Sequence, residues 1–294
     1  MVDDTNTGLS LKQLLERDGY VIVDGLVSED QMQELRDAAE RVVGLARSGQ
    51  WTLRRVVGVS FPPWNEDATV EDVWGVQHVM HPLLAEAAFA RWYGSPALLA
   101  AVCEILDVPE AALQLELFNL LVNPARSDFA LAWHRDDVRP DAAPDEELAR
   151  LATPLHGTQW NTALYDDACL YVVPRSHFRP ASAGERRVWV DDPLSSDMPG
   201  AIAVPLKAGQ TVFYNNNILH RAIYHTSSKR HTLHACIGTV VGGPLRARNI
   251  LQHGLAWMRE DTFKQTLPPR LYPLYDNLIK LANENDGKEL GYSQ

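Results

Sequence analysis

From residue 113 onward the chain consists of short runs rich in strand-forming residues, and this pattern limits the folds that are open to it. Gly, Pro or Asp stands between several of the runs, as expected for turns between strands. The runs are LQLELFNLLV, TQWNTALY, CLYVVP, AIAVPL, QTVFYNN and RHTLHACIGTVV. Many short strands with turn residues between them are typical of a β-sandwich or a barrel.

The first hundred residues have a mainly helical character. A short helix is predicted just before a strand over Tyr20–Val23. Ser28 and Gln31 have the spacing of a capping box, and apolar residues then recur at helical intervals. A further helix is predicted to begin at Ser95, with proline at its first position, and to end at Leu106.

We therefore predict a single domain over residues 1–294. Its parts are a supporting helical layer mainly over 10–110, a β-core over about 113–245, and a C-terminal helical tail over 250–294. Two polar insertions, 137–157 and 181–199, interrupt the strands. Long insertions in a compact β-domain are usually functional loops or lids, so we expect them at the mouth of a pocket.

Composition excludes several classes of function. The net charge of −11 comes from 27 basic and 38 acidic residues without a basic stripe, which argues against nucleic acid and anionic membranes as partners. No apolar run approaches the roughly 20 residues that span a bilayer, and MVDDTNTGLSL lacks the features of a signal peptide, so we expect a cytoplasmic protein. The three cysteines are too widely spaced for a disulfide framework or a CxxC zinc site, and we expect them to be small buried apolar residues.

A candidate metal site begins at His134 and Asp136. In an extended segment, side chains two positions apart point to the same face, so this pair can bind one ion. His220 follows an apolar strand and can supply a third ligand. Two histidines and one carboxylate bind one face of Fe(II) and leave three positions for a bidentate co-substrate and O2. Arg230, one strand further on, can form a two-pronged salt bridge with a carboxylate of that co-substrate.

These motifs occur in a familiar order: WHRDD, LYDDACLYVVPRSH, then LKAGQTVFYNNNILHRA and an arginine. Together with the N-terminal DGYVIVDGLVSEDQMQELRDAAE, they resemble the phytanoyl-CoA dioxygenase family of non-haem Fe(II)- and 2-oxoglutarate-dependent oxygenases. The resemblance extends over roughly residues 10–245. It implies a mainly β fold with flanking helices, in which the core is a double-stranded β-helix, a cupin-like jelly roll.

Compared with the family's motifs, the His-x-Asp pair and the distal histidine match the three iron ligands. Arg230 matches the arginine that holds the far carboxylate of 2-oxoglutarate, although its spacing from the histidine is one residue shorter than usual. Arg221 and Lys229 are the alternatives. Arg221 adjoins a ligand and should face the other way, and lysine is a poorer two-pronged partner than arginine.

Three amide side chains are further candidates for the co-substrate site. The strand TQWNTALY places Gln159 and Asn161 on one face, which the resemblance puts near 2-oxoglutarate. The alternative for Asn161 is a hydrogen bond with the backbone. Asn119 is an inward polar residue among leucines, so it either belongs to the pocket or forms a structural hydrogen bond.

Residues around the ligands are expected to be structural. Arg135 and Asp137 should point away from the metal, and Trp133 should pack in the core. Arg175 replaces the glycine in the family's Pro-Gly-Ser-His turn, which predicts that this turn does not need a positive φ. We interpret His177 of the same turn as structural.

The resemblance predicts an enzyme that oxidises a C–H bond of a small organic molecule by hydroxylation, desaturation, epoxidation or cyclisation. Related halogenases lack a carboxylate at the position of Asp136, so its presence favours oxygenation. Two alternatives remain: a metal-cupin-like isomerase or dioxygenase that does not use 2-oxoglutarate, and a non-catalytic jelly-roll binding protein.

The substrate is expected to come from secondary or amino-acid-derived metabolism, since no basic cluster for coenzyme A and no peroxisomal signal is present. The segment over residues 51–78 contains Trp51, Phe61, Trp64 and Trp74, which suit either a lid over an organic substrate or core packing. The expected partner is a small molecule, and a homodimer is allowed.

Overall fold

The computed structural model describes residues 8–60, 72–288 and 290, and its core consists of two antiparallel sheets. The large sheet has the strand order β1-β9-β6-β11-β4-β3-β2 and the small sheet the order β5-β10-β7-β8. In the large sheet the strands are β1 Tyr20–Val23, β9 Thr211–Tyr214, β6 Gly157–Ala163, β11 His231–Thr239, β4 Leu113–Val122, β3 Val73–Val76 and β2 Arg54–Val56. In the small sheet they are β5 Phe129–Ala130, β10 His220–Tyr224, β7 Leu170–Val172 and β8 Ile202–Ala203.

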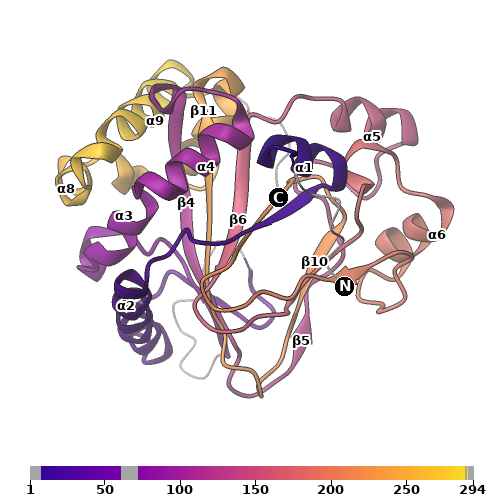
Figure 1. Cartoon of the computed structure of the whole chain (residues 1–294), viewed down its shortest axis with the longest axis horizontal. Helices are drawn as coiled ribbons and strands as arrows, with labels where there is room; N and C mark the ends of the chain where they lie inside the picture. Colours follow the sequence, from indigo (N-terminus) through magenta and orange to yellow (C-terminus); the bar gives the residue numbers. More distant parts are fainter. Residues whose placement is uncertain (1–7, 61–71, 289, 291–294) are drawn as a thin grey trace.

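Helices cover the outer face of the large sheet, as Figure 1 shows for α2, α3, α4 and α9 beside β4, β6 and β11. The helices are α1 Leu11–Asp18, α2 Glu29–Arg47, α3 Ala87–Tyr93, α4 Pro96–Leu106, α5 Pro144–Leu151, α6 Ala183–Arg186, α7 Arg248–Leu251, α8 Asp261–Thr266 and α9 Tyr272–Glu284. They contain more residues than the strands do, but the core is the predicted jelly-roll sandwich. None of the described helices combines the length and the apolar character needed to cross a bilayer.

The N-terminal predictions are confirmed in detail. The side chain of Ser28 accepts a hydrogen bond from the Gln31 backbone N–H. The side chain of Gln31 in turn accepts one from the Ser28 backbone N–H, so the capping box is complete. The side chain of Ser95 caps α4, which ends at Leu106 as predicted. The C-terminal tail is also helical, and Asn277 of α9 donates a hydrogen bond to the Leu113 carbonyl of β4 at 2.7 Å.

Alternation along the central strands gives the large sheet one apolar face and one polar face. Leu120 and Leu233 pair across β4 and β11, are fully buried, and belong to the core that packs against the helices. One position further along, Asn119, His234 and Asn161 are aligned across β4, β11 and β6. Because side chains alternate between faces, these polar residues face the small sheet, and all three line the cavity between the sheets.

The turn at Arg175 contradicts our expectation. Its φ is 65°, so the left-handed conformation that glycine usually provides is kept with an arginine in place. The Arg175 backbone N–H donates to the Asp18 carbonyl at 2.9 Å, which ties the turn to the end of α1. His177 has the expected structural position, with Nε2 3.0 Å from the Glu16 carbonyl and its ring packed against Gly19.

Candidate active site

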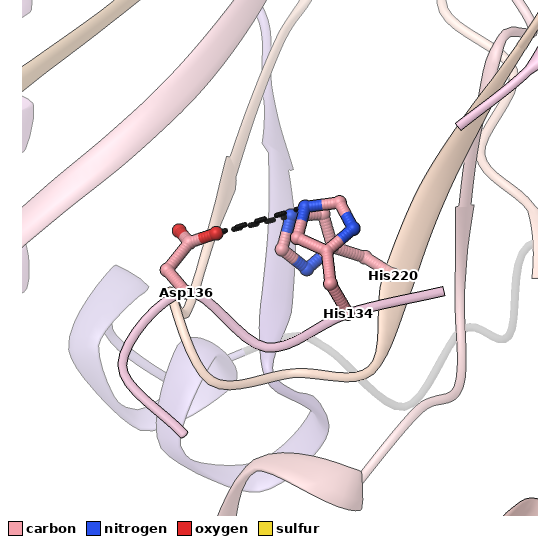
Figure 2. Close-up of side chains that lie close together, drawn as sticks. All are labelled: His134, Asp136 and His220. Atoms are coloured by element: carbon pink, nitrogen blue, oxygen red, sulfur yellow. Dashed lines mark ion pairs between the residues drawn. The ribbon is translucent and has the colours of Figure 1, made fainter. Parts of the chain in front are cut away.

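His134, Asp136 and His220 converge at one end of the sandwich, with their ligand atoms within 4.8 Å of one another. His134 and His220 pair through reciprocal backbone hydrogen bonds of 3.0 and 3.1 Å, which bring the segment after β5 against the start of β10. Asp136 Oδ1 lies 3.7 Å from Nε2 of each histidine (Figure 2). The three side chains predicted from the sequence are therefore brought together.

Neighbouring groups fix the atoms that point inward. Nδ1 of His134 lies 2.7 Å from the Ala132 carbonyl, and Nδ1 of His220 lies 2.8 Å from the Ile218 carbonyl. A carbonyl only accepts, so each Nδ1 carries the proton and each Nε2 keeps a free lone pair for a metal. The tautomer of both rings therefore suits ligation.

The carboxylate is oriented in a comparable way. Gln159 Nε2 donates to Asp136 Oδ2 at 2.7 Å, which leaves Oδ1 toward the two imidazoles. Burial raises the pKa of Asp136, and burial together with the neighbouring His134 lowers the pKa of His220 well below its usual value. Two neutral imidazole nitrogens and one carboxylate oxygen match the donor set of a facial Fe(II) site. The residues present thus fit the ion that the sequence predicts.

The residues between and beside the ligands lie as predicted. Arg135 points away from the cluster, is 1% exposed, and forms an ion pair of 2.9 Å with Glu147 of α5. Trp133 is buried in a separate apolar cluster. Asp137 lies 3.4 Å from Arg248 Nη1 rather than at the cluster.

Arg230 lines the cavity, and the Nε of its guanidinium group is already bound. Its Nε donates to Asp167 Oδ2 at 2.9 Å and to Thr232 Oγ1 at 3.1 Å. The guanidinium carbon lies 4.6 Å from the centre of the Tyr224 ring. Nη1 and Nη2 are buried and have no hydrogen-bond partner among the described residues. Buried donors without partners are costly, and this pair has the geometry of a carboxylate fork.

The two alternatives to Arg230 are directed to other partners, although Arg221 also lines the cavity. The guanidinium of Arg221 lies over the Trp133 ring and donates to the Leu194 carbonyl at 2.9 Å. Lys229 forms an ion pair with Glu40 at 2.9 Å on the surface.

The three predicted amides all line the cavity, each with a partner in the protein. Gln159 holds Asp136, and the Asn161 amide oxygen lies 2.9 Å from His234 Nδ1. Asn119 Oδ1 accepts from the His78 backbone N–H at 2.9 Å. Their hydrogen bonds thus orient other residues of the cavity wall.

Several lining residues were not predicted from the sequence. They include Gln77 and His78, after β3, and Arg248, His253 and Leu255, beyond η6 (Val240–Ala247). None of the lining residues comes from the insertions 137–157 and 181–199, which contain α5 and α6. Trp51 and Trp74 are core residues, and Phe61 and Trp64 lie outside the described residues. The cavity residues that the sequence reasoning missed include Arg55, His78, Tyr214, Tyr224, His234, Cys236, Arg248 and His253.

The cysteine prediction is correct in part. The three cysteines are free thiols, and Cys169 is buried, whereas Cys103 and Cys236 are partly exposed. Cys236 lies on the cavity face of β11, where burial raises the pKa of its thiol.

The family profile described as phytanoyl-CoA dioxygenase matches residues 15–232, which is most of the chain. The chain belongs to the phytanoyl-CoA dioxygenase family. With the His-Asp-His cluster in place, it is an oxygenase that depends on Fe(II) and 2-oxoglutarate. A comparison with curated proteins found no match.

Solved structures share this fold. AviO1 from Streptomyces viridochromogenes Tue57 is similar at 19% identity and a TM-score of 0.55, over 76% of this chain and 91% of that one. The epimerase SnoN, in complex with Fe3+, alpha ketoglutarate and nogalamycin RO, gives 20% identity and a TM-score of 0.53 over 78% and 82%. EctD from S. alaskensis, with 2-oxoglutarate and 5-hydroxyectoine, gives 16% and 0.52 over 77% and 74%. At these identities the likeness shows the fold.

Proposed function

We propose that His134, Asp136 and His220 hold Fe(II) and that Arg230 holds the far carboxylate of 2-oxoglutarate. The observation that supports this most directly is the pair of free Nε2 atoms facing Asp136 Oδ1. The bound iron and co-substrate supply the oxidising chemistry with O2, and the protein binds, orients and excludes water. The reaction is oxidation of a C–H bond in a small organic substrate, in secondary or amino-acid-derived metabolism.

The proposed iron ligands and the proposed co-substrate arginine line the same cavity, which supports this assignment. The iron ligands lie on the strands of the small sheet and its adjoining loop, and Arg230 precedes β11 of the large sheet. Leu121, Leu170 and Ala222 also line the space, so part of its wall is apolar. An apolar wall with a few placed polar groups is typical of small-molecule sites.

Iron binding is the first test. Purified protein is loaded with Fe(II) without oxygen, and iron is measured after desalting for the parent, His134→Ala, Asp136→Ala and His225→Ala. The first two variants should lose bound iron, because each removes one of three ligands. His225→Ala removes an exposed histidine that pairs with Asp128, and it should retain the iron of the parent. Full iron occupancy in both ligand variants would contradict the proposal.

The co-substrate is tested separately, which also distinguishes a metal-cupin-like enzyme that does not use 2-oxoglutarate. Arg230→Gln should weaken 2-oxoglutarate binding at least tenfold, because a charge-assisted bond contributes about 1.5–3 kcal/mol. Arg221→Gln should leave it near the parent value, since Arg221 is directed to Trp133 and Leu194. If Arg221→Gln weakens 2-oxoglutarate binding more than Arg230→Gln does, Arg221 is the co-substrate residue. If neither variant changes 2-oxoglutarate binding, the metal-cupin-like enzyme is favoured.

Product analysis should cover more than hydroxylation. Succinate formation from 2-oxoglutarate, measured with and without candidate substrates, reports whether a compound couples to the reaction. Because SnoN is described as an epimerase, inversion at a stereocentre belongs among the products sought, beside desaturation, epoxidation and cyclisation.

A further inference from the structure

The cavity lining has a strong excess of basic residues. It contains four arginines and five histidines, whereas Asp136 is the only carboxylate among the described residues that line it. The proposed function uses Asp136, two histidines and Arg230. The charges of Fe(II) and of the 2-oxoglutarate dianion cancel, so loading the site with both does not remove the excess. Of the other three lining arginines, Arg221 is directed to Trp133 and Leu194. Arg55 and Arg248 remain, and both lie close enough to His253 to act on its imidazole.

Arg55 is held rigidly against the cavity wall. Its guanidinium carbon lies 5.2 Å from the centre of the Trp74 ring. With the Gln77 amide oriented to match its neighbours, the amide oxygen accepts from Nε and Nη2 of Arg55, and the amide nitrogen donates to Asn119 Oδ1. Burial lowers the pKa of Arg55, and an arginine starts from so high a value that it stays charged. The Tyr224, Tyr214 and Asp136 side chains act on Arg55 electrostatically, and the iron would engage Asp136.

Arg248, at the start of α7, brings a second positive charge to the cavity lining. Its Nη1 lies 3.4 Å from Asp137 Oδ1, a carboxylate that is 36% exposed and therefore partly screened by water. Glu116 also acts on Arg248, but its own ion pair is with Arg246 at 3.0 Å. Both arginines thus have partners in the protein, and both also line the cavity.

Two histidines between these arginines are neutral. Burial, His81, His253 and Arg55 lower the pKa of His78 to about 3, and burial, Arg248 and Arg55 lower the pKa of His253 to about 4. A neutral imidazole offers one N–H donor without a second positive charge. His78 also has a φ of 59°, a strained conformation that the Asn119 side chain holds by its bond to the His78 backbone. Strain of this kind is often kept where a side chain must face a ligand.

We propose that the organic substrate carries a carboxylate, which binds between Arg55 and Arg248 with His78 and His253 as additional donors. This inference rests on the proposed function, because the same cavity must first hold iron and 2-oxoglutarate. A carboxylate is the ligand that complements two guanidinium groups and neutral N–H donors. The rest of the substrate would then contact Leu117, Leu131 and Leu255 of the lining.

The test uses matched acids and amides with the protein loaded with Fe(II) and saturating 2-oxoglutarate, without oxygen. The probes are hexanoate with hexanamide and 3-phenylpropionate with 3-phenylpropionamide, titrated by calorimetry. The visible charge-transfer band of the Fe(II)–2-oxoglutarate complex is followed at the same time. Each acid should bind at least tenfold more tightly than its amide while the band persists. Loss of the band on adding acid would mean displacement of 2-oxoglutarate, which counts against the substrate subsite.

Arginine variants test which residues cause the tighter binding of acids. Arg55→Gln and Arg248→Gln should each lower acid binding about tenfold and leave amide binding unchanged, whereas Arg55→Lys should restore part of the preference. Arg150→Gln, an exposed change on α5, should behave as the parent. Equal binding of acid and amide, no acid binding at millimolar concentration, or a preference that survives both glutamine variants would overturn the inference. If one glutamine variant forms no Fe(II)–2-oxoglutarate band, it has lost co-substrate or iron binding, which concerns the proposed function. The preference for acids is then tested with the other glutamine variant.

Discussion

Each histidine of the cluster is oriented by its own chain, through the carbonyl of the residue two positions earlier. The His134 and Asp136 pair could be predicted because the spacing of two in an extended segment is a local property. The role of Gln159 as the partner of Asp136 could not, because that contact joins the large sheet to the loop after β5. Local geometry is readable from sequence, whereas the identity of a partner across a cavity depends on the complete fold.

Asp167 is a positioning residue for Arg230, and its role can be measured. Its Oδ1 accepts the Cys169 N–H at 2.8 Å, so the oxygen that faces Arg230 Nε is fixed in place. Asp167→Asn should raise the KM for 2-oxoglutarate severalfold and leave kcat nearly unchanged, because the guanidinium loses its charged anchor. Steady-state kinetics with varied 2-oxoglutarate measure this split.

The neighbouring residue provides a matched control for that experiment. Asp166 is exposed and pairs with Lys207 at 2.9 Å on the surface, so Asp166→Asn should leave both constants unchanged. A fall in kcat alone in Asp167→Asn would assign Asp167 a role other than positioning the co-substrate arginine.

At the level of elements, β11 shows what strand periodicity can and cannot predict. His234 and Cys236 line the cavity two positions apart because side chains alternate, and the alternation is visible in the sequence. That β4 and β6 flank β11, with Asn119 and Asn161 opposite His234, is a matter of strand order. Strand order in a jelly roll is set by long-range pairing, which a single sequence does not display.

The turn at Arg175 allows a prediction for stability. Arg175→Gly should raise the free energy of unfolding by about 1 kcal/mol, because glycine adopts a φ of 65° without the clash of a Cβ atom. Arg175→Ala removes the same side chain but keeps Cβ, so it should give no such gain. Urea unfolding of both variants and the parent makes the comparison. Equal stability of the two variants would show that the turn carries no such strain.

At the level of the whole molecule, the cavity lining combines segments that are far apart in sequence. Residues 77–78 contribute to it together with Arg248, His253 and Leu255, whereas the polar insertions 137–157 and 181–199, which we expected at the pocket, do not. Composition indicated that these insertions interrupt the strands, and they contain α5 and α6. Composition did not indicate that they lie outside the cavity lining. The single-domain organisation, the cytoplasmic location, the absence of nucleic-acid and membrane partners and the homodimer stay predictions.

Buried histidines should make the fold sensitive to acid. The pKa is lowered, mainly by burial, to about 3 for His78 and His234 and to about 4 for His231 and His253. Below pH 6.5 the unfolded chain takes up protons that the folded one excludes, so stability falls as the pH drops from 6.5 toward 4. Each such histidine costs on the order of 2 kcal/mol at pH 5.

His231 is the suitable position for measuring this effect, because its side chain lies beside Tyr165 and not in the cavity. Urea unfolding of the metal-free protein at pH 7 and pH 5 gives the loss of stability for the parent. His231→Asn should reduce that loss by about 2 kcal/mol, whatever it does to stability at pH 7. An unchanged loss would show that His231 titrates normally in the folded protein.

The ion pair between Arg135 and Glu147 has a consequence for engineering. Arg135 stands between two proposed iron ligands, and Glu147 belongs to α5 within the first insertion, where it also bonds Arg186 and the Ala181 N–H. Anyone who exchanges residues 137–157 for the corresponding segment of a relative, to alter selectivity, would also remove the counter-charge of a fully buried arginine. Such a chimera needs an acidic residue at position 147, or a neutral residue at 135, if the ligand loop is to keep its shape.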